Sequence, residues 1–217
     1  MPTHINQSNV RRFVFMLISV FFLGVGIALF KLSLMGNDPN TAFVIAAAAK
    51  LGVDFAVLNL FVNSVYFLLE YIFGRSLIGI GTFINWVMVG TVASACDHLG
   101  RYLHLAPEHF ASKLLVMVLG ILILTLSCAI YQTADMGIAP YDSLSIILTR
   151  RSGRSYFWCR AFTDCVGALL TLLLGGLLGI GTLMCALGLS PFISFFTKYV
   201  AEPLLGPAIT SVRKEGV

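Results

Sequence analysis

Charged residues are scarce in this chain. Asp, Glu, Lys and Arg make up 11% of its 217 residues, whereas soluble domains contain about 25%. This scarcity excludes an ordinary soluble domain and, together with 58% hydrophobic residues and a mean hydropathy of +0.92, indicates a membrane protein. The net charge of +4 does not indicate nucleic-acid binding, because the basic residues flank apolar segments, where membrane topology explains them.

Catalytic and cofactor motifs are also missing. The sequence contains no GxSxG, HExxH or Walker-lysine motif, so we expect neither enzyme activity nor a bound cofactor. Its five cysteines lie in or beside apolar runs with no CxxC pair, so we expect buried thiols and no disulfide framework. Three histidines between residues 98 and 109 are irregularly spaced, which does not favour a metal site.

Long apolar segments dominate what is present. Six of them approach the ~20 residues that a transmembrane helix needs. They cover residues 12–34, 55–73, 78–97, 114–135, 156–174 and 179–200. Two further segments, 40–51 and 141–150, are shorter than a standard span. The sequence therefore predicts an all-α, polytopic helical membrane protein.

Two motifs occur twice, with copies about 100 residues apart, a period too long for a solenoid unit. Met35-Gly36-Asn37-Asp38-Pro39 corresponds to Met136-Gly137-Ile138-Ala139-Pro140, and Gly79-Ile80-Gly81-Thr82 corresponds to Gly179-Ile180-Gly181-Thr182. This duplication predicts two tandem pseudo-symmetric repeats, each with three long helices and one short helix after a GxxP break. We expect one membrane domain, 1–217, divided into repeat one (11–98), a polar connecting loop (99–112), repeat two (113–201) and an exposed tail (202–217).

The two short segments leave the topology open. If they dip into the membrane and return, each repeat crosses three times and the halves are inverted. If they cross, each repeat crosses four times and the halves are parallel. The basic residues favour eight crossings, because only Lys31 and Arg75 then face away from the cytoplasm. This arrangement also predicts a cytoplasmic N-terminus.

The helix breaks are the first candidate site. Gly137 permits a conformation that ends a helix, Pro140 suits the first turn of the next one, and the helix dipole favours a carboxylate at Asp142. Asp135 and Asp142 flank the second break, and Asp38 lies inside the first. Such breaks often form the substrate site of transporters. The alternative interpretation is a plain capped turn.

The second candidate is a charged pair inside segment 156–174. Arg160 and Asp164 are four residues apart, so they share a helix face and can pair. Charges within the membrane are costly and are therefore functional candidates. Asn59 and Asn63 occupy the matching positions of the first half. The alternative is a structural ion pair, or an Arg160 side chain that reaches the membrane interface.

Two other features are expected to be structural. Glu70, at the end of segment 55–73, is expected to pair with Arg75 at the membrane interface. The glycines of the two GIGT motifs are expected to serve helix packing, because no phosphate-binding lysine accompanies them.

These motifs also occur in a known pattern. Arg11-Arg12-Phe13 precedes the first span, Ala134-Asp135-Met136-Gly137-Ile138-Ala139-Pro140-Tyr141-Asp142 forms a D-x-G-x-x-P-x-D loop, and Ser155, Arg160, Asp164 and a GIGT motif follow. Over nearly the whole chain this order resembles the YczE/YitT-like family of bacterial integral membrane proteins. The first half departs from the pattern, with Leu34 and Thr41 at the two Asp positions. The resemblance implies a bacterial inner membrane and little about activity.

The leading hypothesis is a small-molecule transporter or permease whose ligand is a small molecule or ion. Asp135 and Asp142 would contact the ligand or a proton, and Arg160 would bind an anion or form a gating ion pair. The alternative is a non-transporting membrane scaffold or an accessory subunit for a partner protein. The lipid bilayer is an expected partner and nucleic acid is not, while a homo-oligomer remains open.

Overall fold

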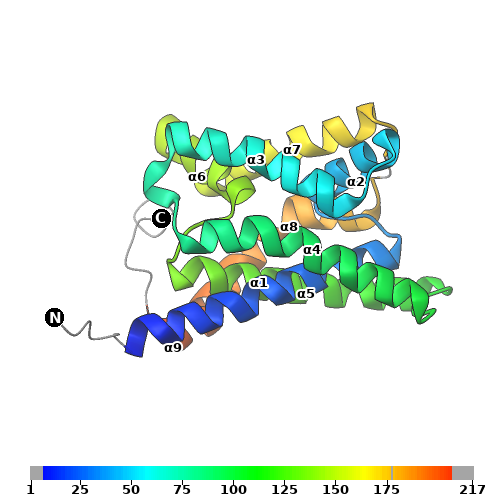
Figure 1. The fold of residues 1–217 in the computed structure, drawn as a ribbon, viewed down its shortest axis with the longest axis horizontal. Helices are drawn as coiled ribbons and strands as arrows, with labels where there is room; N and C mark the ends of the chain where they lie inside the picture. Colours follow the sequence, from blue (N-terminus) through cyan, green and yellow to red (C-terminus); the bar gives the residue numbers. More distant parts are fainter. Residues whose placement is uncertain (1–6, 177, 207–217) are drawn as a thin grey trace.

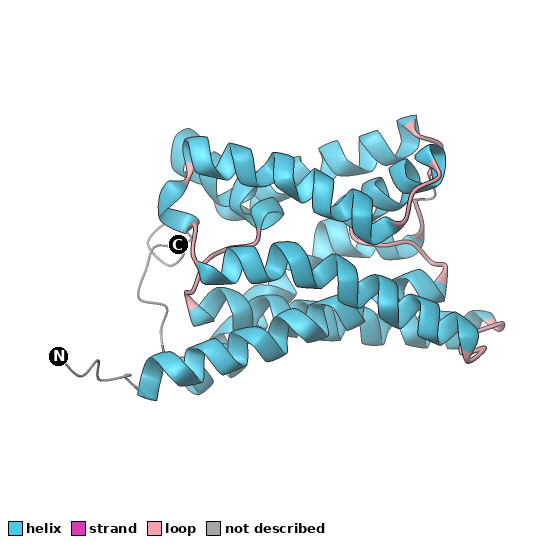
Figure 2. Cartoon of the chain, viewed as in Figure 1, coloured by secondary structure: helices cyan, strands magenta, loops and turns pink. Residues whose placement is uncertain are grey.

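A computed structural model describes residues 7–176 and 178–206 of the chain. In these ranges the regular structure is helical and contains no strand (Figure 2). The long helices are α1 (Gln7–Ser33), α3 (Phe55–Phe73), α4 (Ile80–Tyr102), α5 (Phe110–Ala134), α7 (Tyr156–Leu173) and α8 (Ile180–Phe196). The short helices are α2 (Pro39–Leu51), η1 (Arg75–Leu77), α6 (Pro140–Ser152), η2 (Thr197–Ala201) and α9 (Glu202–Leu205). The expected all-α fold, with a short helix after each GxxP break, is confirmed.

Several of these helices have the length and composition of membrane spans. Four qualify in the described part of the chain: Asn9–Ser33, Phe55–Phe73, Phe110–Ala134 and Tyr156–Leu173. A fifth results if the bent pair Ile180–Ala186 and Gly188–Leu205 counts as one span. The remaining expected span, α4, is 23 residues long and packs along α1, but it carries the polar residues Asn85 and Asp97.

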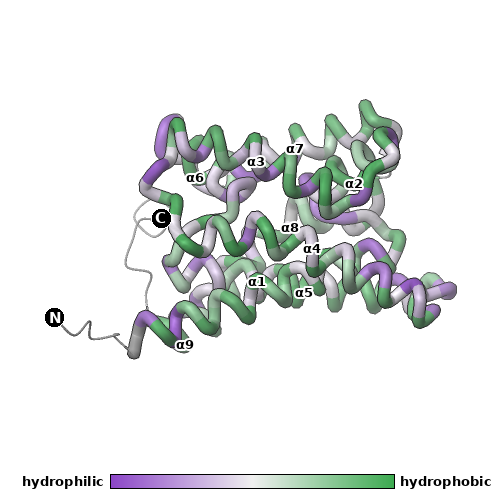
Figure 3. Tube along the Cα trace, viewed as in Figure 1, coloured by the Kyte–Doolittle hydropathy of each residue, from purple (hydrophilic) through white to green (hydrophobic). Residues whose placement is uncertain are grey.

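The outward surface is apolar, as contact with lipid requires. Phe61 on α3 is 65% exposed and Leu173 at the end of α7 is 69% exposed. Hydrophobic residues run along the outer helices (Figure 3). An exposed apolar surface of this extent on several helices is typical of a protein embedded in a bilayer. The chain is therefore a helical membrane protein.

Two expected boundaries are wrong. The polar stretch after residue 98 continues α4 to Tyr102, because Asp97 pairs with Lys31 of α1 (2.9 Å) and with Arg101 one turn on (3.1 Å). The connecting loop is therefore residues 103–109. The tail begins with α9, in which Leu204 is exposed but Leu205 is only 2% exposed, so the segment from residue 202 is not exposed throughout. Residues 207–217 lie outside the described residues.

Helices α1 and α5, the first long helices of the two halves, run antiparallel (Figure 1). Near the start of α1, Arg12 donates hydrogen bonds to the carbonyl oxygens of Thr133 at the end of α5 (3.1 Å) and Leu205 at the end of α9 (2.9 Å). Farther along α1, Gly26 lies against Gly120 of α5. Parallel repeats would require α1 and α5 to run in the same direction. The parallel arrangement with eight crossings is therefore wrong.

Helices α2 and α6 begin near each other and run towards opposite ends of the bundle (Figure 1). Tyr66, in the middle of α3, donates a hydrogen bond to Asn40 of α2 (3.0 Å), and its ring centre lies 5.6 Å from that of Tyr141 of α6. At its far end α6 reaches η1, where Arg150 donates to Ser76 (2.8 Å). Helix α2 instead follows α7 towards the other end of the bundle.

The length of the short helices explains this path. Each has 13 residues, which corresponds to about 20 Å of helix against a hydrocarbon core of about 30 Å. The chain therefore returns to the middle of the bundle at each break, and the short helix leads it out again. This path, like the antiparallel packing of α1 and α5, matches the inverted alternative and not the parallel one (Figure 1). The distribution of basic residues led to the wrong prediction because it reports only on which side of the membrane each loop lies. It does not report whether a short helix begins inside the membrane or at its surface.

The two breaks are held by the opposite half of the molecule. The amide of Gly81 donates to the carbonyl oxygen of Met136 (2.7 Å), and the amide of Gly181 donates to that of Met35 (2.8 Å). An added Cβ at Gly79 or Gly179 would overlap these same carbonyl groups. The duplicated GIGT motifs are thus surfaces on which the duplicated breaks pack.

The inverted path predicts the sides on which two exposed loop residues lie. Val53 follows α2 and Arg154 follows α6. In a background without the five native cysteines, Val53→Cys and Arg154→Cys should react with an impermeant thiol reagent from opposite sides of the membrane. Labelling from the same side would support parallel halves and contradict the antiparallel packing of α1 and α5.

The close packing at the breaks predicts an intolerance of side chains. Gly79→Ala and Gly179→Ala should each destabilise the fold by about 1–3 kcal/mol, because backbone must move to admit the methyl group. The control is Gly188→Ala on α8, where an added Cβ meets only ordinary contacts at 3.6 Å and 3.7 Å. Melting temperatures of the detergent-purified variants measure the difference. Equal melting of all three would show that the breaks can shift freely.

Candidate functional site

The starts of α2 and α6 bring carboxylates into the middle of the bundle. Pro39 and Pro140 occupy the first helical positions, where a missing N–H group costs nothing. Asp38 caps α2 by accepting a hydrogen bond from the amide of Thr41 (3.1 Å). Asp142 lies in the first turn of α6 and is buried, where the helix dipole favours its charge.

Arg160 of α7 joins two of the buried carboxylates. One oxygen of Asp142 pairs with the Arg160 guanidinium, and the other accepts a hydrogen bond from the hydroxyl of Tyr131 on α5. Asp164 lies 3.4 Å from Nε of Arg160 and accepts a hydrogen bond from Tyr141 (2.6 Å). The expected pairing of Arg160 with Asp164 is confirmed. An anion at the Arg160 guanidinium would therefore compete with two carboxylates that already pair with it.

The matching positions of the first half carry an uncharged pair. Asn63 donates from its side-chain amide to the backbone carbonyl oxygen (2.9 Å) and the side-chain oxygen (3.1 Å) of Asn59. Both residues are buried on α3. Their remaining hydrogen-bonding capacity faces the interior, so one side of the site is neutral and the other is charged.

These side chains surround a cavity of about 70 Å³. Its walls come from α1, α3, α4, α5, α7 and α8 and from the starts of α2 and α6. The polar groups that face it include Asp38, Asn40, Asn59, Asn63, Asp142 and Arg160. Five of the predicted site residues therefore meet at one cavity: Asp38, Asn59, Asn63, Asp142 and Arg160. Asp164 lies behind them, against Arg160.

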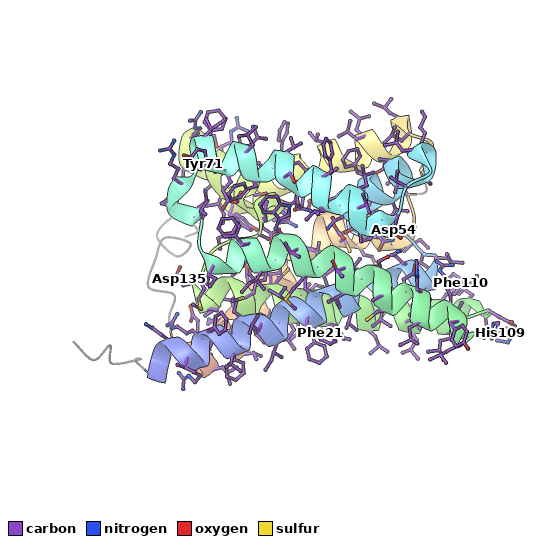
Figure 4. The ribbon with its side chains drawn as sticks, viewed as in Figure 1. Phe21, Asp54, Tyr71, His109, Phe110 and Asp135 are labelled. Carbon is purple, nitrogen blue, oxygen red and sulfur yellow. The ribbon has the colours of Figure 1, made fainter. Side chains whose placement is uncertain are left out.

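Three other predicted site residues lie elsewhere or act only through the backbone. Asp135 ends α5 in a left-handed conformation (φ 56°) at the end of the bundle, away from the cavity (Figure 4). Gly137, with φ +118°, packs against Gly79 and Thr82. Pro140 begins α6. The structure therefore does not bring Asp135 to the cavity that Asp142 lines, because the turn between them separates their side chains.

The predicted pair of Glu70 and Arg75 is also absent. Arg75 donates from Nε to the carbonyl oxygen of Tyr71 (2.9 Å) and stacks on that tyrosine's ring. Glu70 is completely buried, and neither of its carboxyl oxygens has a hydrogen-bond partner in the described part of the chain. The sequence showed that Glu70 lies about one turn before a basic residue. It did not show that the Glu70 side chain points into the bundle, away from Arg75.

Sequence reasoning also missed the tyrosines that hold the acids. Tyr141 stands between Pro140 and Asp142, so its place in the first turn of α6 was a usable signal. No signal in the sequence pointed to Tyr131, because it meets Asp142 only when the chain folds back between the end of α5 and the start of α6. As for metals, no group of three or more His, Cys, Asp or Glu side chains suited to a metal ion occurs among the residues described. The five cysteines are free.

The charge cluster predicts a strong dependence of its members on one another. Arg160→Met leaves the Asp142 and Asp164 carboxylates buried without their cation, so we expect a loss of about 3–5 kcal/mol in stability. Adding Asp142→Asn removes one of these charges and should restore part of the loss. The control, Arg154→Met in the exposed loop before α7, should change stability by no more than about 0.5 kcal/mol. Thermal melting in detergent gives the comparison, and simple addition of the two site effects would contradict the coupling.

Comparisons with known proteins agree with this membrane architecture. An uncharacterized protein of Haemophilus influenzae is 25% identical over 187 residues, which cover 86% of this chain and 84% of that protein. The uncharacterized membrane protein YczE of Bacillus subtilis is 24% identical over 187 residues, 83% of each chain. The uncharacterized protein YyaS of the same bacterium is 24% identical over 174 residues, 77% of this chain and 83% of that protein. No solved structure matches the chain.

The family match covers the helices that build the cavity. Residues 10–198, from α1 through α8, match the family of unknown function DUF6198. Together with the similarity to YczE, this match confirms the resemblance to YczE-like membrane proteins. The breaks, the GIGT motifs and the charged helix α7 therefore lie inside the matched region, and the chain belongs to the DUF6198 family.

Proposed function

We propose that this protein is a membrane transporter of small cations, with the central cavity as its binding site. One observation carries the proposal: two short helices that leave towards opposite ends of the bundle begin at a single buried polar cavity. Non-helical backbone at membrane depth is tolerated where it is packed in protein or lines a cavity. In transporters, sites of this kind lie near the bilayer midplane, between the repeats.

The charges around the cavity favour a cation. Arg160 supplies one positive charge, and the N-termini of α2 and α6 supply roughly half a charge each. When ionised, Asp38, Asp142 and Asp164 supply three negative charges, so about one negative charge remains. The carboxylates of Asp38 and Asp142 also already occupy the positions near the helix N-termini that an anionic ligand would take. One monovalent cation would neutralise the site.

The size and chemistry of the lining narrow the ligand. A water molecule needs about 10–15 Å³ of comparable volume, so the cavity of about 70 Å³ holds a few water-sized groups and no large solute. Its acceptors are carboxylate and side-chain amide oxygens, from residues such as Asp38, Asn59 and Asn40. This lining suits an alkali-metal ion or a small ammonium group, and the two share the same oxygen ligands.

A second cavity lies beside the break that leads into α2. It measures about 500 Å³ and lies where α1, α2 and α7 end, with Lys31, Lys50 and Arg101 among its lining residues. Asn37 lines this outer cavity and the next residue, Asp38, lines the central one. At the opposite end, Arg150 bonds to Ser76 and Arg151 stacks on Phe73. An outer cavity at one end and engaged side chains at the other are compatible with alternating access.

The proposal includes a location and an orientation. We place the protein in the bacterial plasma (inner) membrane with its N-terminus in the cytoplasm. The end of the bundle at which α1 begins is the richer in arginine: Arg11, Arg12, Arg75, Arg150, Arg151 and Arg154 lie there. The other end has Lys31, Lys50, Arg101 and Lys113. An excess of basic residues marks the cytoplasmic side.

The decisive variant is Asp38→Asn. Asparagine caps a helix about as well as aspartate and can still accept the hydrogen bond from Thr41, so the fold should persist while the charge is lost. Losing a charged contact worth about 1.5–3 kcal/mol should weaken cation binding about tenfold or more. The assay is uptake of sodium, potassium or methylammonium into liposomes that contain the purified protein.

The matched control is Asp135→Asn, the same substitution at the other acid beside a break but outside the cavity. It should transport as the wild type does. Equal uptake by the Asp38 and Asp135 variants would refute the cavity as the binding site. No cation-dependent uptake by the wild-type protein would refute transport and favour the accessory-subunit alternative.

A further inference from the structure

Glu70 is an unusual carboxyl group for the interior of a membrane protein. It lies in the last turn of α3 with no exposed surface, and both carboxyl oxygens lack a hydrogen-bond partner in the part of the chain that the structure describes. An ionised carboxylate in such surroundings would carry a large desolvation cost. The same group with a proton bound carries no charge and avoids most of that cost.

Within residues 7–176 and 178–206, no ion pair of Glu70 with a basic side chain is found. Asp142, in the first turn of the adjacent helix α6, has the same sign of charge as an ionised Glu70 and does not compensate it. In η1, which follows α3, Arg75 donates a hydrogen bond to the carbonyl oxygen of Tyr71. At the end of α6, Arg150 donates to Ser76 and Arg151 stacks on Phe73. On α4, the ionisable residues Asp97, His98 and Arg101 lie at the far end of the helix, and Tyr131 of α5 is bound to Asp142.

The second half of the protein carries no matching acid. The position that corresponds to Glu70 is Thr171 of α7, which is also fully buried but donates its hydroxyl to the carbonyl oxygen of Gly167 (2.8 Å). The protein therefore has one ionisable group at this pair of positions. Glu70 lies towards the end of the bundle where α6 ends, opposite the outer cavity of about 500 Å³.

We propose that Glu70 is a proton-binding site and that its proton is exchanged for the cation in the central cavity. The inference rests on the proposed function and assigns its coupling ion. A positive charge in the cavity beside Asp142 offsets the negative charge that favours a proton on Glu70. As the cation binds, the Glu70 O–H bond breaks, the carboxylate keeps the electron pair, and the proton passes to water. One positive charge enters as one leaves, so the charge of the protein interior is unchanged.

The first measurement is infrared spectroscopy of the purified protein. A protonated carboxyl group has a C=O absorption that is distinct from that of a carboxylate. This band should be present in the wild type without added cation and lost in Glu70→Gln, whose neutral amide resembles the protonated acid in shape. The control, Glu108→Gln in the exposed loop before α5, should keep the band. A band that survives in Glu70→Gln, or is missing from the wild type, overturns the proton site.

The second measurement is proton release on addition of sodium, potassium or methylammonium to the weakly buffered protein, followed with a pH dye. The wild type and Glu108→Gln should release up to one proton per cation bound, and Glu70→Gln should bind the cation without release. Proton release that persists in Glu70→Gln overturns the exchange. If the infrared band behaves as expected but no cation binds, the proposed transport function fails and the proton site stands.

Discussion

The structure depends on two hydrogen bonds that cross between the halves of the chain. Backbone groups at a helix break have no partner in lipid, so a break can exist in a membrane only where other protein groups satisfy it. Here the carbonyl oxygen of Met35 accepts from Gly181, and that of Met136 accepts from Gly81. The glycines are required because the two backbones approach too closely for a side chain.

The position of the central site follows from these two hydrogen bonds between the halves. Once both breaks are fixed, α2 and α6 begin in the interior, and their first turns bring Asp38 and Asp142 to the same cavity. Arg160 then offsets part of the charge, and Tyr131 and Tyr141 hold the acids in place. The site is therefore built from helix starts and a rigid ion-pair cluster. It needs no flexible loop to position its polar groups.

Much of the fold was present in the sequence. Segment lengths gave the helices, the duplicated motifs gave the breaks, and the four-residue spacing gave the pairing of Arg160 with Asp164. The direction of the second half could not be predicted, because a short apolar segment has the same composition whether it crosses or returns. Asp135 and Asp142 stand equally close to the break in sequence, but a left-handed residue at Asp135 turns the chain between them. Glu70 was misjudged because a neighbouring Arg75 suggests a pair, and only the helix packing shows which side chain faces inward.

These two hydrogen bonds between the halves have a consequence for the order in which the protein assembles during synthesis. During synthesis, Met35 enters the membrane long before its partner Gly181 leaves the ribosome, so the first break must wait with an unsatisfied carbonyl group until nearly the last helix arrives. The second break has no such delay, since Gly81 is already in place when Met136 emerges. The two hydrogen bonds therefore form in order. The bond at the second break can form as soon as Met136 is inserted, whereas the bond at the first break must wait for α8.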